Sequence, residues 1–257
     1  QKIIFIPYCP SGAKEFPVKI LIGWPVRNRA WILPHYLRAM QSLDYPREKL
    51  QYCFVLNNST DCCQEIIEEF ARNNNTDIII CDQEKPRGVE RGYYSFTHLA
   101  SLRNTLLNQF LETGADYLFS VDSDILVPAD SLSRLIAHNC DIVSMLVCNG
   151  HQIGDPDVYN VLRQVDDRYE YIRDFPRHGV FPVDCTGAAY LIKRRVITRG
   201  VRYCTDGGGE DIGFCQQARE MGFQLYCDGS LEAFHIMHEN QLSLLKNNGT
   251  VKTGAGE

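Results

Sequence analysis

The chain has 257 residues, of which 44% are hydrophobic, and it carries a formal net charge of −6 at pH 7. This size allows one large domain with a substantial core, and the negative charge without a dominant basic stripe argues against nucleic acid as a partner. No apolar run is long enough for a transmembrane segment, and the start lacks the basic and apolar regions of a signal peptide.

Eleven cysteines are a high count for this length. Several lie within or beside apolar runs, where a free thiol behaves as a small hydrophobic residue. Their number is odd, and no pair has the spacing of a zinc site. This pattern favours a reduced, cytoplasmic protein over a secreted, disulfide-bonded one, and the secreted alternative stays open.

The first half of the chain alternates between apolar runs and segments of helical periodicity. After an irregular N-terminal arm at 1–17, runs rich in β-branched and aromatic residues predict strands, and repeats at helical spacing predict helices between them. The expected strands are 18–24, 50–56 and 77–81, and the expected helices are 32–40, 63–73 and 94–111. This repetition predicts a parallel sheet with right-handed crossovers, and a polar, glycine-containing loop is expected at 84–92.

The second half of the chain is less regular. The expected helices there are 129–138 and 212–221, and the expected strands are 117–121, 141–148, 183–193 and 224–226. Residues 149–181 are polar, aromatic and irregular, so they either form a wall of a binding site or cover the core. A polar tail is expected at 241–257.

The strand at 117–121 ends in the motif Asp122-Ser123-Asp124. In an open α/β sheet, ligands bind beyond the carboxyl ends of the strands, which is where both carboxylates are expected. Two anions so close together repel each other unless a cation lies between them and a ligand, and hard oxygen ligands suit Mg²⁺ or Mn²⁺. A polar turn would have the same composition, so the motif alone leaves both interpretations open.

A second acidic pair, Glu210-Asp211, follows three consecutive glycines and directly precedes the helix expected at 212–221. The helix dipole favours carboxylates at this position, so a purely stabilising role is the alternative to a chemical one. No Walker-type loop and no G-x-G-x-x-G motif follows any predicted strand, which excludes P-loop NTPases and Rossmann dehydrogenases.

In their order and spacing, these segments resemble the GT-A fold glycosyltransferases, close to family 2 enzymes and to the donor domains of collagen-type sugar transferases. The segments that carry the resemblance are 25–28, 57–61, 99–104, 122–124, 187–189, 210–211 and a late histidine. The resemblance implies an α/β fold with a mostly parallel central sheet flanked by helices and a smaller acceptor-side subregion. Residues 18–148 would form the nucleotide-sugar-binding half, and residues 149–240 the acceptor and catalytic half.

The resemblance also implies a site for a nucleotide-sugar donor. The donor-binding residues that it implies are Pro25, Val26, Arg27, Asn57, Arg103, Asp122, Ser123, Gly187 and Ala188. An acidic residue near the position of Asn57 often contacts uracil in the family. The asparagine here leaves the base open, with a UDP-sugar favoured over a GDP-sugar.

A Mn²⁺ or Mg²⁺ ion is part of the implied site. Asp124 would ligate the ion directly, and Asp122 would contact the ribose or bridge to the ion through a bound water. His235 resembles the histidine that some members add to the metal ligands. His238 competes for this role, because strand alternation would send the two histidines to opposite faces.

For catalysis, the resemblance to inverting enzymes implies that Asp211 accepts the proton of the acceptor hydroxyl, with Glu210 as the next candidate. The metal ion and Arg103 would stabilise the negative charge that develops on the leaving nucleoside diphosphate. The predicted function is transfer of a sugar to a hydroxyl of a carbohydrate, peptide or small-molecule acceptor. A retaining enzyme would change the role of Asp211.

Two other functions stay open. A sugar nucleotidyltransferase has a related sheet, but it would need a glycine-rich, basic loop after the first strand, and the loop at 25–29 lacks the glycines. Non-catalytic carbohydrate binding would give no reason to keep the two acidic motifs together.

Overall fold

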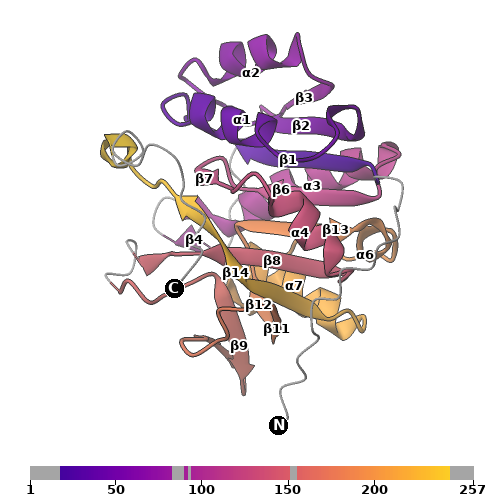
Figure 1. Ribbon diagram of the computed structural model, residues 1–257, viewed down its shortest axis with the longest axis vertical. Helices are drawn as coiled ribbons and strands as arrows, with labels where there is room; N and C mark the ends of the chain where they lie inside the picture. Colours follow the sequence, from indigo (N-terminus) through magenta and orange to yellow (C-terminus); the bar gives the residue numbers. More distant parts are fainter. Residues whose placement is uncertain (1–17, 83–89, 92–93, 151–154, 244–257) are drawn as a thin grey trace.

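The computed structural model describes residues 18–82, 90–91, 94–150 and 155–243. Within these ranges, nine strands form one sheet in the order β11-β14-β8-β13-β6-β1-β2-β3, with β7 paired to β14 (Figure 1). Their bounds are β1 Ile20–Val26, β2 Leu50–Leu56, β3 Thr76–Ile80, β6 Tyr117–Val121, β7 Ile125–Leu126, β8 Ile142–Val147, β11 Val180–Val183, β13 Ala189–Lys193 and β14 Leu225–His235. The predicted arm and most of the predicted loop at 84–92 lie outside the described residues; only a short β4–β5 pair, Glu90–Arg91 with Tyr94–Ser95, is described there.

Helices cover both faces of the sheet. Their bounds are α1 Leu33–Gln41, α2 Cys63–Ala71, α3 Phe96–Glu112, α4 Ser131–Ala137, α6 Arg194–Thr198 and α7 Glu210–Glu220, with short 3₁₀ turns at Arg47–Lys49, Asp206–Gly208 and Glu239–Gln241. Side chains of α1, α2 and α4 join one hydrophobic cluster, and side chains of α3, α6 and α7 join the other. Among the described helices, none combines the length and the apolar character needed to cross a membrane.

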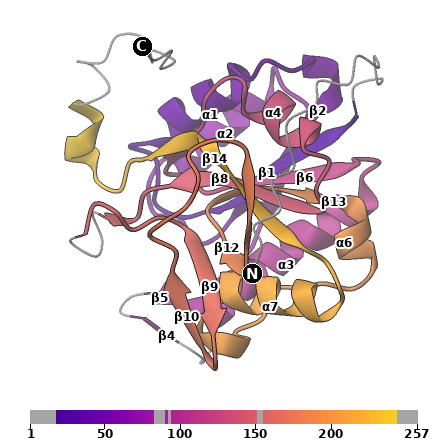
Figure 2. The ribbon, with the colours of Figure 1, turned by 60° about the horizontal axis from the view of Figure 1, so that its bottom comes forward.

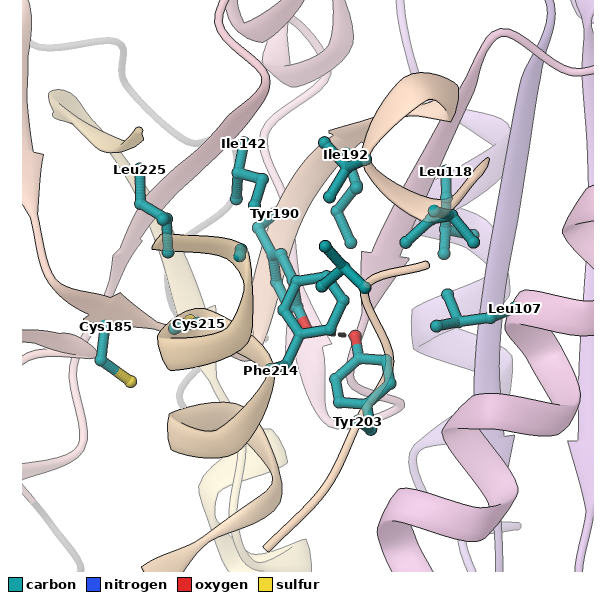
Figure 3. Packing of buried hydrophobic residues seen from close by; sticks show 14 of the residues in the cluster. Leu107, Leu118, Ile142, Cys185, Tyr190, Ile192, Tyr203, Phe214, Cys215 and Leu225 are labelled. Carbon is teal, nitrogen blue, oxygen red and sulfur yellow. Dashed lines mark hydrogen bonds between the residues drawn. The ribbon is translucent and has the colours of Figure 1, made fainter. Parts of the chain in front are cut away.

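The central strands are apolar on both faces because each face packs against a helical layer. In β1, Leu21 belongs to the cluster on the α3 side, whereas Ile20 and Ile22 belong to the cluster on the α1 side. Figure 3 shows part of the α3-side cluster, where the ring of Phe214 stacks on Tyr203 with centroids 4.5 Å apart. This double burial explains why the predicted bounds of β2 and β6 agree with the observed ones.

Four strands that run in parallel, β6, β1, β2 and β3, place their carboxyl ends at one edge of the sheet. Strand β13 runs antiparallel between β6 and β8, so that Ala189 at its start lies opposite Val121 at the end of β6. The start of β13 and the ends of β1, β2 and β6 therefore meet at the same edge. The predicted fold class is confirmed.

Two predicted strand boundaries near this edge are wrong. Pro25 and Val26 belong to β1 and pair with Val55 and Leu56, instead of starting a loop. The strand expected at 183–193 is broken at Gly187 and Ala188, where Ala188 adopts a φ of 66°. The two residues before the break, Cys185–Thr186, form β12. This short strand belongs to a separate three-stranded sheet.

Residues 155–181 contain more regular structure than expected. Strands β9 (Val161–Val165) and β10 (Arg168–Tyr171) form a hairpin that joins β12 in a three-stranded sheet (Figure 2). The rings of Tyr159, Phe175 and Phe181 pack on one another, with successive centroids 5.5 and 5.3 Å apart. These aromatic residues cover the core, which was the second of the two expected roles.

Strand β14 continues well beyond the short strand expected at 224–226. A bulge interrupts its pairing with β8 between Asp228 and Glu232. The buried Asp228 carboxylate accepts hydrogen bonds from His138 Nε2 at 2.9 Å and from the Ser230 backbone at 2.9 Å. A sequence with turn composition is thus held inside a strand, and the strand carries His235 to the edge where β6 ends.

Candidate functional site

A cavity of about 470 Å³ lies at the carboxyl edge of the sheet. Its walls come from the ends of β1, β2 and β6, the first turns of α3 and α7, and the last residue of β14. The predicted site residues that line it are Pro25, Val26, Arg27, Asn57, Arg103, Asp122, Ser123, Asp124, Ala188, Glu210, Asp211 and His235. The structure therefore brings together segments that are more than 200 residues apart in the chain.

The Asp122-Ser123-Asp124 motif forms a tight turn between β6 and β7. The Asp122 backbone N–H donates to the Ala188 carbonyl at 2.8 Å, and the Ile125 N–H donates to the Asp122 carbonyl at 2.9 Å. The Ile236 N–H donates to the Asp124 carbonyl at 2.9 Å. The backbone of the turn is thus fixed by the residue before β13 and the residue after β14, and both aspartates line the cavity.

Arg103 lies at the centre of the charged part of the cavity. Its side chain projects from α3, is 3% exposed, and places its guanidinium carbon 3.9 Å from the centroid of the Trp24 ring. Its Nη2 atom is 3.7 Å from Asp122 Oδ1, 3.4 Å from Glu210 Oε1 and 3.5 Å from Asp211 Oδ1. One guanidinium faces three carboxylates, so this cluster has an excess of negative charge when all three are ionised.

Several polar atoms of this cluster lack hydrogen-bond partners among the described residues. They are Nε and Nη1 of Arg103 and Oδ1 of Asp122, all of them buried. An unsatisfied buried donor or acceptor costs about 1–3 kcal/mol and is rare in native proteins. Two donors and one acceptor at the same cavity wall are therefore suited to a polar, charged ligand.

Glu210 and Asp211 occupy the first turn of α7, which begins two residues earlier than predicted. Asp211 packs directly against Gly187: a Cβ atom built on Gly187 would lie 2.2 Å from Asp211 Oδ2. The Tyr190 hydroxyl donates to Asp211 Oδ1 at 3.4 Å and also hydrogen-bonds the Tyr203 hydroxyl. Gly187 thus does not line the cavity, but its missing side chain provides the space for the Asp211 carboxylate.

Burial dominates the proton affinities of these carboxylates. It raises the pKa of Glu210 to about 7, and the neighbouring Asp211 charge adds to this shift while Arg103 opposes it. Burial also raises the pKa of Asp122 and of Asp211, again against the lowering effect of Arg103. The cluster therefore binds protons more tightly than ordinary carboxylates do.

Asp124 and His235 are the residues best placed for a divalent cation. His235 Nε2 lies 3.9 Å from Asp124 Oδ1, and its Nδ1 contacts the Cys148 carbonyl at 3.3 Å, an arrangement common for metal-binding histidines. The second Asp124 oxygen accepts from Arg29 Nη2 at 3.2 Å. A carboxylate and an imidazole fit part of the shell of Mn²⁺, whose other ligands would be phosphate oxygens and water.

The described residues contain no group of three or more His, Cys, Asp or Glu side chains placed to hold a metal ion. The structure does not bring His238 to the cavity. It is exposed and lies beyond the end of β14, where its backbone N–H donates to Gln241 Oε1 at 3.0 Å. The expectation that strand alternation decides between the two histidines was wrong, because only His235 is on the strand.

A neutral part of the cavity lies where β2 ends and α3 begins. Asn57 is 1% exposed; its amide donates to the Cys81 carbonyl at 3.0 Å, and its Oδ1 lies 3.0 Å from His98 Nε2. Ser95 caps α3 by accepting from the His98 backbone at 3.3 Å. Asn57 thus lines the cavity as predicted, while its side chain is held by the protein itself.

Seven cavity residues were not predicted as site residues from the sequence, and three of them, Trp24, Arg29 and His98, carry large polar or aromatic side chains. Trp24 ends the first predicted strand, and Arg29 belongs to the polar loop that follows. Both positions are at the carboxyl end of a strand, where a ligand site was expected. The sequence carried no such signal for His98, because its contact with Asn57 joins residues 41 positions apart in different elements.

Comparison with known proteins identifies relatives of this chain. A sequence model of the N-terminal domain of glycosyltransferase family 25 matches residues 17–228. Human procollagen galactosyltransferase 2 is 28% identical over 205 residues, which are 72% of this chain and 32% of the relative. A Drosophila melanogaster glycosyltransferase 25 family member is 26% identical over 205 residues, 72% of this chain and 33% of the relative. The chain thus spans about a third of the length of these relatives.

Solved structures with the same fold include two sugar transferases. The mannosyltransferase PcManGT from Pyrobaculum calidifontis, solved with GDP-Man and Mn²⁺, is similar with a TM-score of 0.61 at 16% identity, over 91% of this chain and 61% of that one. GalNAc-T7, solved with UDP, GalNAc and Mn²⁺, is similar with a TM-score of 0.65 at 14% identity, over 88% and 45% of the two chains. The fold and the family resemblance expected from the sequence are confirmed.

Proposed function

Because the chain belongs to glycosyltransferase family 25, we propose that it transfers a sugar from a nucleotide-diphosphate sugar to an acceptor hydroxyl, with inversion at the anomeric carbon. The observation that carries this proposal is the convergence of Asp122, Glu210 and Asp211 on the buried Arg103. A UDP-sugar is the favoured donor and a GDP-sugar the second candidate, since structural neighbours were solved with nucleotides of both kinds. The acceptor would be a carbohydrate, a peptide or a small molecule.

The donor's diphosphate would lie beside the acidic turn. Asp124 and His235 would hold a Mn²⁺ or Mg²⁺ ion there, and Asp122 would contact the ribose or a water on that ion. Such an ion, when bound, supplies Lewis-acid stabilisation of the negative charge on the leaving diphosphate. Nε and Nη1 of Arg103 are buried donors without partners in the described residues, and diphosphate oxygens can accept from them.

Asp211 would be the general base. Its raised pKa brings its proton affinity closer to that of a base working near neutral pH, which favours proton transfer from the acceptor hydroxyl. The Tyr190 hydroxyl and Gly187 hold its carboxylate from two sides. Glu210 is more deeply buried, with a side chain 8% exposed against 29% for Asp211, so it serves better to set the local charge.

A cytoplasmic location, expected from the cysteine pattern, is part of the proposal. The ten cysteines in the described ranges are all free thiols, which supports it. The division into donor-binding and acceptor-binding halves likewise stays a prediction.

Thermal unfolding with nucleotides tests the donor site. UDP, GDP, CMP and TDP are each added with and without Mn²⁺, and a ligand that binds only the folded state raises the melting temperature. We expect a metal-dependent rise with UDP, lost in Asp124→Ala and kept in the control Asp174→Ala, whose side chain is exposed outside the cavity. No rise with any nucleotide would contradict the donor site.

Transfer itself is measured as nucleotide release from a UDP-sugar with a panel of hydroxyl acceptors. We expect acceptor-dependent release, and NMR of the product would show the inverted anomer. A retained anomer would remove the base role of Asp211. Nucleotide binding without any acceptor-dependent release would favour a binding protein over a transferase.

A further inference from the structure

Asn160 is a buried polar residue next to the site, and it does not line the cavity. It is 4% exposed and directly precedes β9 of the three-stranded sheet. Its backbone N–H donates to the Val147 carbonyl at 3.0 Å, and its Oδ1 accepts from the Val147 N–H at 2.8 Å. Asn160 is thus joined to the end of β8 through both its backbone and its side chain.

The Asn160 amide nitrogen reaches across to the break between β12 and β13. Nδ2 donates to the Gly187 carbonyl at 2.8 Å and to the Met145 carbonyl at 3.0 Å, and it lies 3.4 Å from Thr186 Oγ1. These contacts use both donors and the acceptor of the side chain, so Asn160 has one defined orientation. It links β8, β9 and the segment at 186–187 in a single hydrogen-bonded group.

The segment that Asn160 holds is a strained turn. The Ala189 N–H donates to the Gly187 carbonyl at 2.8 Å, two residues back, and Ala188 between them has a φ of 66°. A γ-turn with positive φ is rare, and a non-glycine residue in this region costs about 1–3 kcal/mol. The Gly187 carbonyl therefore accepts from both the turn and Asn160, and the second bond helps to keep the turn in place.

This turn contacts both acidic motifs. The Ala188 carbonyl accepts from the backbone N–H of Asp122, and Gly187 leaves the space that the Asp211 carboxylate fills. Because a Cβ on Gly187 would lie 2.2 Å from Asp211 Oδ2, a small shift of this peptide would displace the carboxylate. The position of Asp211 thus depends on the turn, and the turn depends on Asn160.

We infer that Asn160 is a positioning residue for sugar transfer, which holds the 187–189 turn so that Asp211 is placed to accept the acceptor's proton. The inference rests on the proposed function, since it acts through the base role of Asp211. Asn160 has no contact with the cavity and would not bind donor or acceptor itself.

The first test is the kinetics of Asn160→Ala. A displaced catalytic group costs roughly 100-fold per ångström, so we expect kcat to fall about 10- to 100-fold while KM for the donor changes less than about twofold. The matched control is Ser144→Ala, which removes the 2.7 Å hydrogen bond from Thr186 Oγ1 in the same buried layer but leaves Gly187 untouched. An Asn160→Ala enzyme whose kcat equals that of Ser144→Ala would overturn the inference.

The second test separates positioning from a loss of folding. In an Asp211→Asn background, Asn160→Ala should lower kcat no further, because both changes remove the same function. A purely structural role would lower kcat by the same factor in both backgrounds. If Asn160→Ala does not fold, Asn160→Asp is measured in the same way. Aspartate keeps the shape of the side chain and the hydrogen bond from Val147, but it loses the donors to Gly187 and Met145.

A crystal structure of Asn160→Asp gives a readout that needs no activity. We expect the 187–189 turn and the Asp211 carboxylate to be displaced relative to the parent protein. An unchanged turn would overturn the inference even for a chain that transfers no sugar. A displaced turn in a parent chain without transferase activity would instead contradict only the proposed function, since the structural dependence would stand.

Discussion

The cavity has two parts that differ in how their polar groups are satisfied. In the neutral part, Asn57 and His98 hydrogen-bond each other, and Asn57 also bonds the backbone of Cys81. In the charged part, Arg103 faces three carboxylates and keeps two buried nitrogens without partners in the described residues. The protein itself thus engages both side-chain polar atoms of Asn57, whereas the described residues leave part of the Arg103 guanidinium unsatisfied.

This difference indicates two kinds of recognition. A preformed neutral wall can select a base by shape and by a few fixed groups, with little rearrangement on binding. Burial raises the pKa values of these carboxylates, neighbouring carboxylates add to the shift for Asp122 and Glu210, and the excess of negative charge favours any partner that brings positive charge. The charged part is therefore where protons, a divalent cation and arginine side chains compete for carboxylates, and each of the following changes alters that competition.

The largest effect is expected for Asp211→Asn. An amide cannot accept the proton of the acceptor hydroxyl, so kcat should fall by about 10²–10⁴-fold. The near-identical shape should leave nucleotide affinity close to that of the parent. Steady-state kinetics with titration calorimetry checks this, and an Asp211→Asn enzyme with parental kcat would exclude Asp211 as the base.

Arg103→Met should destabilise the fold by about 3–5 kcal/mol at pH 8, because it leaves buried carboxylates without their counter-ion. The loss should be smaller at pH 5, where carboxylates with raised pKa values are protonated. Urea unfolding at both pH values measures it. Arg195→Met, which breaks an exposed ion pair with Asp141, is the control and should change little. An equal loss at both pH values would argue against the charge excess.

Glu210→Gln should stabilise the protein at alkaline pH only. The folded pKa of about 7 lies above the ordinary value of 4.5, so the folded state binds the proton more tightly, and stability falls as pH rises from about 4.5 to 7. Glutamine mimics the protonated form and removes this loss. Its advantage over the parent should be on the order of 3 kcal/mol at pH 8 and vanish at pH 4. Urea unfolding across this range would reveal a pH-independent difference if Glu210 were not titrating.

Arg29→Ala should have the smallest effect, and the direction of the change in Mn²⁺ affinity is what tests the proposal. Its ion pair with Asp124 occupies one oxygen of the proposed metal ligand, so removing it should tighten Mn²⁺ binding without nucleotide by about fivefold. Arg27→Ala, in the same loop and exposed, is the control. Titration calorimetry or the Mn²⁺ spin-resonance signal reports the affinity. Weaker Mn²⁺ binding in Arg29→Ala would mean that Arg29 does not compete with the ion.

The sequence predicted the fold best where burial is two-sided. Strands β2 and β6 are mostly apolar because helices cover both faces, and polar residues follow each of them at the cavity. The alternation of sequence elements then predicts parallel strands, and their carboxyl ends bring Asn57 and Asp122 to one edge. The parts of the site that depend only on this rule could be predicted from the sequence.

The remainder depends on contacts between distant residues. The Asp228-Gly229-Ser230 segment has the composition of a turn, yet β14 continues through it because His138 and Ser230 satisfy the buried Asp228. The roles of Arg29 and Asn160 likewise come from hydrogen bonds across 95 and 27 positions. Local propensity does not encode such pairs, so neither the contact of Arg29 with Asp124 nor that of Asn160 with Gly187 could be predicted from the sequence.

The stacking of Arg103 on Trp24 has an optical consequence. The chain has two tryptophans, and only Trp24 lines the described cavity, where its indole lies under a charged group that binding would disturb. In a Trp31→Phe variant, Trp24 would be the single emitter. The emission wavelength and intensity of Trp24 would then report occupancy of the cavity in real time during rapid mixing with any nucleotide. The measurement needs neither a label nor catalytic turnover.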